Sequence, residues 1–287
     1  MNPVVVSALA VMGAMGLIFG AGLAVASRFF SVRKDERVAR VEEALPGTNC
    51  GVCGAPACRG FAEGVVIGKY PVHGCVVGGN AVARNIAKIL GAVAEEVIRR
   101  VAVVRCRGDR NSCVERAQYQ GIRQCCAAVL IQNGAKGCVY GCLGFGDCAQ
   151  ACPFDAITME ENGLPKVHEG KCRGCGECTK ACPRGIMELI STEQRIFIAC
   201  SSKDFGDAVK NVCNVGCIGC SLCANPKVTA EGRITMEGKL PKIHYDRIRD
   251  PVRDLENAVR KCPTSSFGIR GGGPDSTPQI EKNAEPS

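Results

Sequence analysis

The longest apolar stretch of the chain lies at its N-terminus. Residues 1–27 contain no charged side chain, and residues 4–26 are almost wholly apolar. A helix of this length is long enough to cross a bilayer core of about 30 Å. The pattern therefore predicts a transmembrane anchor over residues 1–28.

Basic residues follow the apolar stretch directly and predict its orientation. The first charge is Arg28, and the next basic residues are Arg33, Lys34, Arg37 and Arg40. Because such residues favour the cytoplasmic side of a membrane, we expect a single-pass protein with its bulk in the cytoplasm. The alternative is a cleaved signal peptide, since Ala24-Val25-Ala26 has the small-x-small pattern of a cleavage site. A signal peptide carries its charge before the apolar stretch, so the order favours an anchor.

Beyond the anchor, the polar and apolar pattern predicts short helices. Residues 33–44 are charged and amphipathic, and Leu45-Pro46-Gly47 ends this linker helix. Residues 62–68 and 81–90 predict two further short helices. Residues 101–106 and 195–200 are strand-like.

The rest of the chain contains an internal repeat. Ile157-Thr158-Met159-Glu160 recurs as Ile234-Thr235-Met236-Glu237, and residues 164–168 recur as residues 240–244. Each copy predicts a strand–turn–strand hairpin, and the strand-like residues 101–106 align with residues 195–200. Two modules of one ancestry therefore lie in tandem.

Composition adds the strongest chemical signal, because the chain has 22 cysteines. A disulfide scaffold is typical of small domains with poor cores, whereas 46% of these residues are hydrophobic. Zinc sites usually pair two C-x2-C knuckles across a spacer. Here Cys172, Cys175, Cys178 and Cys182 precede Pro183 as C-x2-C-x2-C-x3-C-P, the spacing of a ferredoxin that binds 4Fe-4S clusters.

The spacing assigns ligands to three clusters outside the second copy and to a fourth within it. A first unit predicts a cluster bound by Cys50, Cys53, Cys58 and Cys75. In the first ferredoxin copy, the usual middle thiol of one run is Phe145, so we expect Cys138 to substitute for it. The second predicted cluster is therefore bound by Cys138, Cys142, Cys148 and Cys182, and the third by Cys152, Cys172, Cys175 and Cys178.

The second copy has lost one complete ligand set. Lys227, Ile248, Pro251 and Asp254 occupy the positions of its four thiols. The other set survives and predicts a fourth cluster bound by Cys217, Cys220, Cys223 and Cys262. The cofactors expected are thus three to four 4Fe-4S clusters.

Six cysteines are left over: Cys106, Cys113, Cys125, Cys126, Cys200 and Cys213. One interpretation is that they are buried thiols, the common fate of free cysteine. The other is that Cys106, Cys113 and Cys125 bind an additional cluster together with Cys138, which would leave three thiols in the second set.

The fold class that follows is α+β: a transmembrane helix, a small helical 4Fe-4S domain and tandem ferredoxin-like modules. The expected boundaries are an anchor at 1–28, a linker helix at 29–45, a 4Fe-4S domain at 46–94, a connecting strand and helix at 95–135, a two-cluster ferredoxin domain at 136–192, a degenerate one-cluster module at 193–270 and a disordered tail at 271–287.

Charge and motifs exclude other functions. The net charge of +8 is offset by oxidised four-thiolate clusters, which carry about −2 each. Only 5% of residues are aromatic, which argues against nucleic-acid binding. The chain has neither G-x-G-x-x-G after a strand nor a Walker loop, so we expect no NAD or flavin site and no catalytic side chain.

The residues resemble a known family in combination. Three features carry the resemblance. They are the anchor, the unit Leu45-Pro46-Gly47-Thr48-Asn49-Cys50-Gly51-Val52-Cys53-Gly54 continuing to Cys58 and Cys75-x2-Gly78-Gly79, and the ferredoxin runs. Over residues 1–270 these features resemble the B subunit of the Rnf complex. This complex is an ion-translocating ferredoxin:NAD oxidoreductase of bacterial inner membranes. The longer form of this B subunit, with extra ferredoxin-like sequence, is the better match.

The resemblance implies an electron-transfer subunit that accepts electrons from reduced ferredoxin and passes them toward NAD reduction, coupled to Na⁺ or H⁺ transport. Its partners would be the other subunits of the complex, soluble ferredoxin and membrane lipid. The alternatives are a membrane-tethered polyferredoxin for another reductase and part of a system that reduces a redox-sensing regulator.

Several basic residues have two interpretations. One interpretation is that they form a docking surface for an acidic ferredoxin. The other is that they are a solvated face that balances cluster charge. These residues are Arg105, Arg107, Arg110, Arg247, Arg249 and Arg253.

Overall fold

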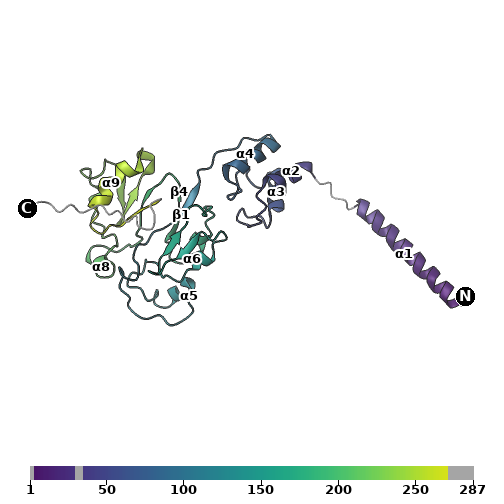
Figure 1. Ribbon diagram of the computed structural model, residues 1–287, viewed down its shortest axis with the longest axis horizontal. Helices are drawn as coiled ribbons and strands as arrows, with labels where there is room; N and C mark the ends of the chain where they lie inside the picture. Colours follow the sequence, from purple (N-terminus) through teal and green to yellow (C-terminus); the bar gives the residue numbers. More distant parts are fainter. Residues whose placement is uncertain (1–2, 30–34, 271–287) are drawn as a thin grey trace, which may run out of the picture.

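The computed structural model describes residues 3–29 and 35–270 (Figure 1). Its first element is α1 (Pro3–Phe29), which contains a segment, Leu9–Arg28, that is long and apolar enough to cross a membrane. This segment is not buried against the rest of the protein, unlike the core helix of a soluble domain. The basic residues Arg33 and Lys34 and the predicted tail at 271–287 lie outside the described residues.

Three helices form a small unit after the linker: α2 (Glu36–Ala44), α3 (Cys58–Val66) and α4 (Gly79–Leu90). They pack around Val41, Phe61 and Ile86, each of which is almost completely buried. α3 begins four residues earlier than the sequence predicts, because the amide of Cys58 donates to Asn49 Oδ1 at 2.8 Å and starts the helix at that cysteine.

The first repeat copy contains two antiparallel strand pairs and short helices. β1 (Arg100–Val104) pairs with β4 (Met187–Ser191), and β2 (Ile157–Met159) pairs with β3 (Pro165–Val167). Its helices are α5 (Cys125–Leu130), α6 (Asp147–Gln150) and α7 (Glu177–Ala181). α6 and α7 contact each other, and each follows a glycine of positive φ, a conformation that glycine adopts without steric cost.

The second copy repeats this arrangement. β5 (Ile196–Ile198) pairs with β8 (Phe267–Ile269), and β6 (Ile234–Glu237) pairs with β7 (Leu240–Ile243). Its helices are α8 (Asp207–Lys210) and α9 (Pro251–Lys261), with 3₁₀ turns η1 (Leu222–Ala224) and η2 (Tyr245–Arg247). The equivalence extends to side chains: Thr158 Oγ1 lies 2.9 Å from His168 Nε2, and Thr235 Oγ1 lies 2.8 Å from His244 Nε2.

The copies differ where the second has lost its four thiols. α9 has 11 residues, whereas α7 has 5. Pro251 occupies the first turn of α9 and Asp250 caps it, accepting from the amides of Val252 and Arg253. Asp254 accepts from the amide of Asp250 at 3.3 Å and forms a 3.0 Å ion pair with Arg233.

Apolar side chains fill the adjoining space. Leu255 is completely buried, and Ile248 packs against the same core. Residues that align with the predicted cluster ligands thus build a capped helix and an apolar core instead.

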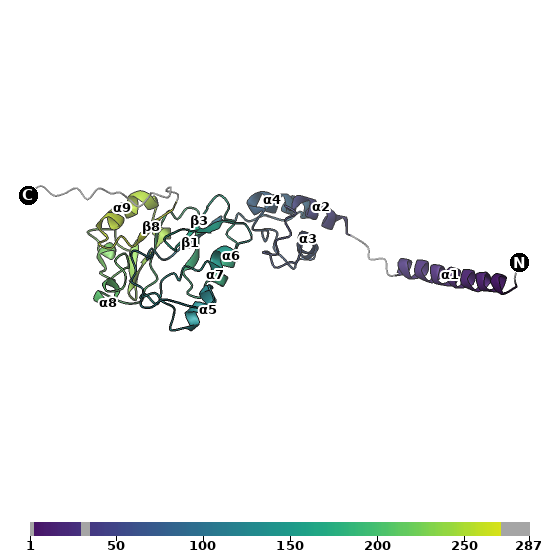
Figure 2. The ribbon, with the colours of Figure 1, turned by 60° about the horizontal axis from the view of Figure 1, so that its bottom comes forward.

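The two ferredoxin-like modules are in direct contact. The amide of Val114 donates to Val212 O at 2.9 Å, and the amide of Asn214 donates to Ser112 O at 3.0 Å. These bonds flank an isolated bridge between Cys113 and Cys213. In Figure 2 the second module, in green and yellow, lies against the teal first module.

Candidate iron–sulfur sites

Site one lies in the small helical unit. Four thiols line one cavity there: Cys50, Cys53, Cys58 and Cys75. Gly51 and Gly54 have φ of 72° and 86°, so they turn the loop where a side chain would be strained. The amide of Gly78 donates to Cys75 Sγ at 3.4 Å. The structure therefore brings together the first ligand set that the sequence predicts.

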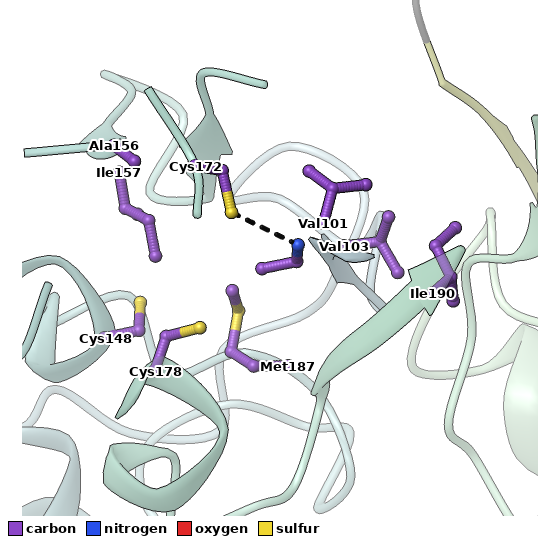
Figure 3. Close-up of a cluster of buried hydrophobic side chains, with 10 residues drawn as sticks. Val101, Val103, Cys148, Ala156, Ile157, Cys172, Cys178, Met187 and Ile190 are labelled. Carbon is purple, nitrogen blue, oxygen red and sulfur yellow. Dashed lines mark hydrogen bonds between the residues drawn. The ribbon is translucent and has the colours of Figure 1, made fainter. Parts of the chain in front are cut away.

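Site three lies in the core of the first module. Cys172 and Cys178 are buried there, and Cys152 packs against them. Figure 3 shows Cys172 and Cys178 extending into the space between the strands and α7, with the amide of Ala102 donating to Cys172 Sγ at 3.5 Å. The amide of Ala156 donates to Cys152 Sγ at 3.4 Å. Cys175 lies near Cys152 and Cys172, so its thiol completes the predicted set.

Site two differs from the sequence prediction in one thiol. Its cavity is lined by Cys125, Cys142, Cys148 and Cys182. Cys138, which we expected here, lines a separate cavity together with Cys106 and Cys200. The predicted alternative that grouped Cys125 with Cys138 is likewise not what the structure shows, because these two thiols lie in different cavities.

Contacts of the inserted segment explain how Cys125 reaches site two. Asp147 Oδ1 and Oδ2 accept from the amides of Cys125 at 2.7 Å and Cys126 at 3.0 Å, so a carboxylate of α6 holds the start of α5. Burial alone would raise the pKa of Asp147, but these hydrogen bonds lower it below its usual value. The ring of Phe145, at the position of the missing thiol, packs 5.4 Å from that of Tyr119 in the same insertion.

Site four lies in the second module. Its cavity is lined by Cys217, Cys220, Cys223 and Cys262. The amide of Ser266 donates to Cys262 Sγ at 3.3 Å, the counterpart of the bond from Ala156 to Cys152. The surviving ligand set of the second copy is therefore also brought together.

The thiol groups are electrostatically costly to ionise without a bound cation. Burial, together with the charges of the neighbouring Cys175 and Cys172, raises the pKa of Cys178 to about 12. Burial likewise raises the pKa of Cys142 to about 12 and that of Cys223 to about 12. Four adjacent thiolates need the positive charge of a metal centre.

The donor sets fit a four-iron cluster better than zinc. Among residues 3–29 and 35–270, no group of three or more His, Cys, Asp or Glu side chains is arranged to hold a single metal ion. The thiols instead surround cavities, and backbone amides donate to several of their sulfurs. Thiolate ligands and amide donors to sulfur are the typical surroundings of iron–sulfur clusters.

Several arginines of the expected docking surface have structural contacts. Arg105 forms a 3.2 Å ion pair with Glu188, and Arg107 donates to the carbonyl of Phe267 at 3.3 Å. Arg110 donates to Glu161 O and Arg247 to Gly232 O. These contacts favour a role in fastening loops and modules.

Comparisons with known proteins agree with this chemistry. Residues 45–77 match the FeS family model, which describes an Fe-S cluster, and residues 137–186 match the 4Fe-4S dicluster domain. The B subunit of the Na(+)-translocating ferredoxin:NAD(+) oxidoreductase complex of Acetobacterium woodii is 41% identical over 88% of this chain and 74% of its own length.

Two further relatives carry related names. The B subunit of the ion-translocating oxidoreductase complex of Methanosarcina acetivorans is 38% identical over 94% of this chain and 100% of its own length. The B subunit of the proton-translocating ferredoxin:NAD(+) oxidoreductase complex of Clostridium ljungdahlii is 44% identical over 74% of this chain and 75% of its own length.

Proposed function

The chain belongs to the family of B subunits of ion-translocating oxidoreductase complexes, and we propose that it is the iron–sulfur electron-transfer subunit of such a complex. It takes electrons from reduced ferredoxin and passes them toward NAD reduction, coupled to Na⁺ or H⁺ transport. The observation that carries this proposal is the sorting of thiols from distant segments into separate sets of four.

Four sets would hold four 4Fe-4S clusters. Sites one, three and four keep the ligands that their spacing predicts, and site two takes Cys125 in place of Cys138. Bound clusters would supply one-electron redox chemistry. The chain's own residues would bind them, orient amide donors toward their sulfurs and exclude water, as the burial of Cys148, Cys172 and Cys178 indicates.

The membrane anchor would be α1, with the cluster-binding modules in the cytoplasm. Arg28 ends the apolar segment, and Arg37 and Arg40 follow in the next described helix. This asymmetry supports the cytoplasmic side for the modules. The proposed partners are the membrane subunits of the complex and soluble ferredoxin, whose oxidation would slow with rising salt if basic side chains steer its approach.

Anaerobic purification of the full chain in detergent tests the proposal. We expect iron and sulfide without zinc, at least about 16 iron atoms per chain for four clusters, and electron paramagnetic resonance signals after reduction. Cys125→Ser and Cys148→Ser should each remove the same cluster signal, whereas Cys126→Ser, which changes an exposed thiol, should remove none. A colourless protein or one that holds only zinc would refute the proposed function.

A further inference from the structure

The largest unassigned group of thiols lies where the two ferredoxin-like modules meet. We propose that this group is a fifth 4Fe-4S site, bound by Cys106 and Cys138 of the first module and by Cys200 and Cys213 of the second. We call it the interface site. The inference rests on the proposed iron–sulfur function and extends it beyond the matched family regions, because Cys106, Cys200 and Cys213 lie outside residues 45–77 and 137–186 and only Cys138 lies within them.

The cavity resembles the other candidate sites in its lining. As at site two, cysteines from separate segments of the chain surround one space. Five thiols line it, from Cys106, Cys113, Cys138, Cys200 and Cys213. Cys113, Cys200 and Cys213 are at most 8% exposed. Isolated structural thiols have no reason to gather from three separate segments around one cavity.

The internal repeat selects four of the five thiols. Cys106 follows β1 and Cys200 follows β5, the equivalent strands of the two copies. The amide of Cys142 donates to Cys106 Sγ at 3.3 Å, and the amide of Cys217 donates to Cys200 Sγ at the same 3.3 Å. The site therefore receives an equivalent first thiol from each module, with an equivalent amide donor.

The second pair of thiols is also equivalent. Cys138-x3-Cys142 aligns with Cys213-x3-Cys217. In each loop, a Cβ added at the intervening glycine, Gly141 or Gly216, would lie 3.5 Å from the Cβ of the first cysteine. The two modules thus present matching pairs of thiols to one cavity, as expected if it arose between duplicated copies.

Cys113 is the thiol without a counterpart. It lies in the segment between Cys106 and Cys138 that is far shorter in the second copy, where only 12 residues separate Cys200 from Cys213. Its backbone forms the bridge to Cys213 between the modules, and its thiol lies beside that of Cys213. We assign Cys113 as a hydrogen-bond partner of a ligand sulfur, a contact that tunes the potential of a cluster.

Two half-buried cations lie beside the interface site. Lys136 lines the cavity, and its Nζ donates to Cys142 O at 2.9 Å. Arg184 Nη1 donates to Cys138 O at 2.9 Å and to Gly141 O at 2.6 Å. In the described part of the chain, neither side chain forms an ion pair with a carboxylate. An oxidised four-thiolate cluster carries about −2. Lys136 would offset part of this charge from within the cavity, where Arg105 and Arg107 also lie, and Arg184, which lines site two, would act from the shared wall.

The position of the interface site gives it a role. Three residues separate Cys138 from Cys142 of site two, and three residues separate Cys213 from Cys217 of site four. The interface site therefore adjoins a site of each module. It would provide the connection between the two modules that sites two and four lack on their own.

Iron analysis of the full chain in detergent, purified without oxygen, tests the inference. We expect about 20 iron atoms per chain for five clusters, and a loss of about four in Cys106→Ser and in Cys200→Ser, with the resonance signals of the other clusters retained as evidence of folding. Cys126→Ser should keep all the iron. Cys113→Ser should also keep it but shift the potential of one cluster.

The outcomes separate this inference from the proposed function. About 16 iron atoms in the unchanged protein, with no loss in Cys200→Ser, would refute the interface site and leave the proposed function standing. Absence of iron from the unchanged protein would refute both. Retention of iron in Cys213→Ser together with loss of iron in Cys113→Ser would overturn the ligand assignment. A Cys113–Cys213 disulfide detected by mass spectrometry in the anaerobic protein would refute the site.

Discussion

Replacement of Asp147 by alanine should selectively destabilise site two. The two carboxylate oxygens accept from the amides of Cys125 and Cys126 and so hold α5 against α6. Cys125 is the one thiol of site two that comes from the inserted segment. Loss of the carboxylate would therefore release a ligand while leaving the loops that carry Cys142, Cys148 and Cys182 intact.

The size of the effect follows from the two hydrogen bonds. Hydrogen bonds to a charged group contribute about 1.5–3 kcal/mol each, and Asp147 is only half-buried, so we take the lower end. The pair then contributes roughly 3 kcal/mol, which corresponds to about a 100-fold change in an equilibrium constant. If this energy acts fully on retention of Cys125, Asp147→Ala should lose the cluster of site two up to about 100-fold faster.

Cluster loss can be measured as iron released to a chelator under argon, with resonance spectra that identify which cluster is lost. Glu177→Ala is the matched control, because Glu177 precedes Cys178 in α7 as Asp147 precedes Cys148 in α6. Unlike Asp147, Glu177 forms an ion pair within its own helix, with Lys180 at 2.7 Å. Equal rates of iron release from both variants would show that the Asp147 contacts do not hold the ligand.

Other perturbations address the folding of the modules. Leu255→Ala should cost about 2–5 kcal/mol, because the leucine is completely buried; an unchanged midpoint of anaerobic urea unfolding would contradict this. Asp250→Ala should cost about 1 kcal/mol through loss of the cap of α9, and the same assay should show a smaller shift than that of Leu255→Ala. Removal of iron should abolish the near-ultraviolet circular dichroism of the first module, since Cys148, Cys172 and Cys178 form part of its core; an unaltered spectrum would show that this core packs without metal.

Local patterns predicted most of the secondary structure. The repeated hairpins appear at 157–167 and 234–243 because both their strands and their turns lie in one short segment. Ligand sets one, three and four were likewise accessible from spacing, since most of each set lies on one loop. Such features depend little on how distant parts of the chain pack.

The thiols that spacing misplaced depend on distant contacts. Cys125 lies 22 residues from the carboxylate that holds its amide, and no motif marks that contact. A weak signal existed, because Phe145 removes one thiol and the insertion before it supplies several. The grouping of Cys106 with Cys200 requires the two modules to meet, which a repeat alone does not specify.

The two incomplete cysteine runs represent different solutions to the same physical problem. A site with three thiolates would leave part of a cluster without a protein ligand and a buried charge without its partner, so an intermediate ligand count is unfavourable. In the first module one thiol is missing, and Cys125 from an insertion lines the same cavity and would restore a set of four. In the second module all four are missing, and an apolar core with Leu255 and a longer, capped α9 replaces the whole site. If the proposed ligand sets hold, the ligand count is four or none in both modules, and the irregular runs are better explained as rebuilt sites than as decaying ones.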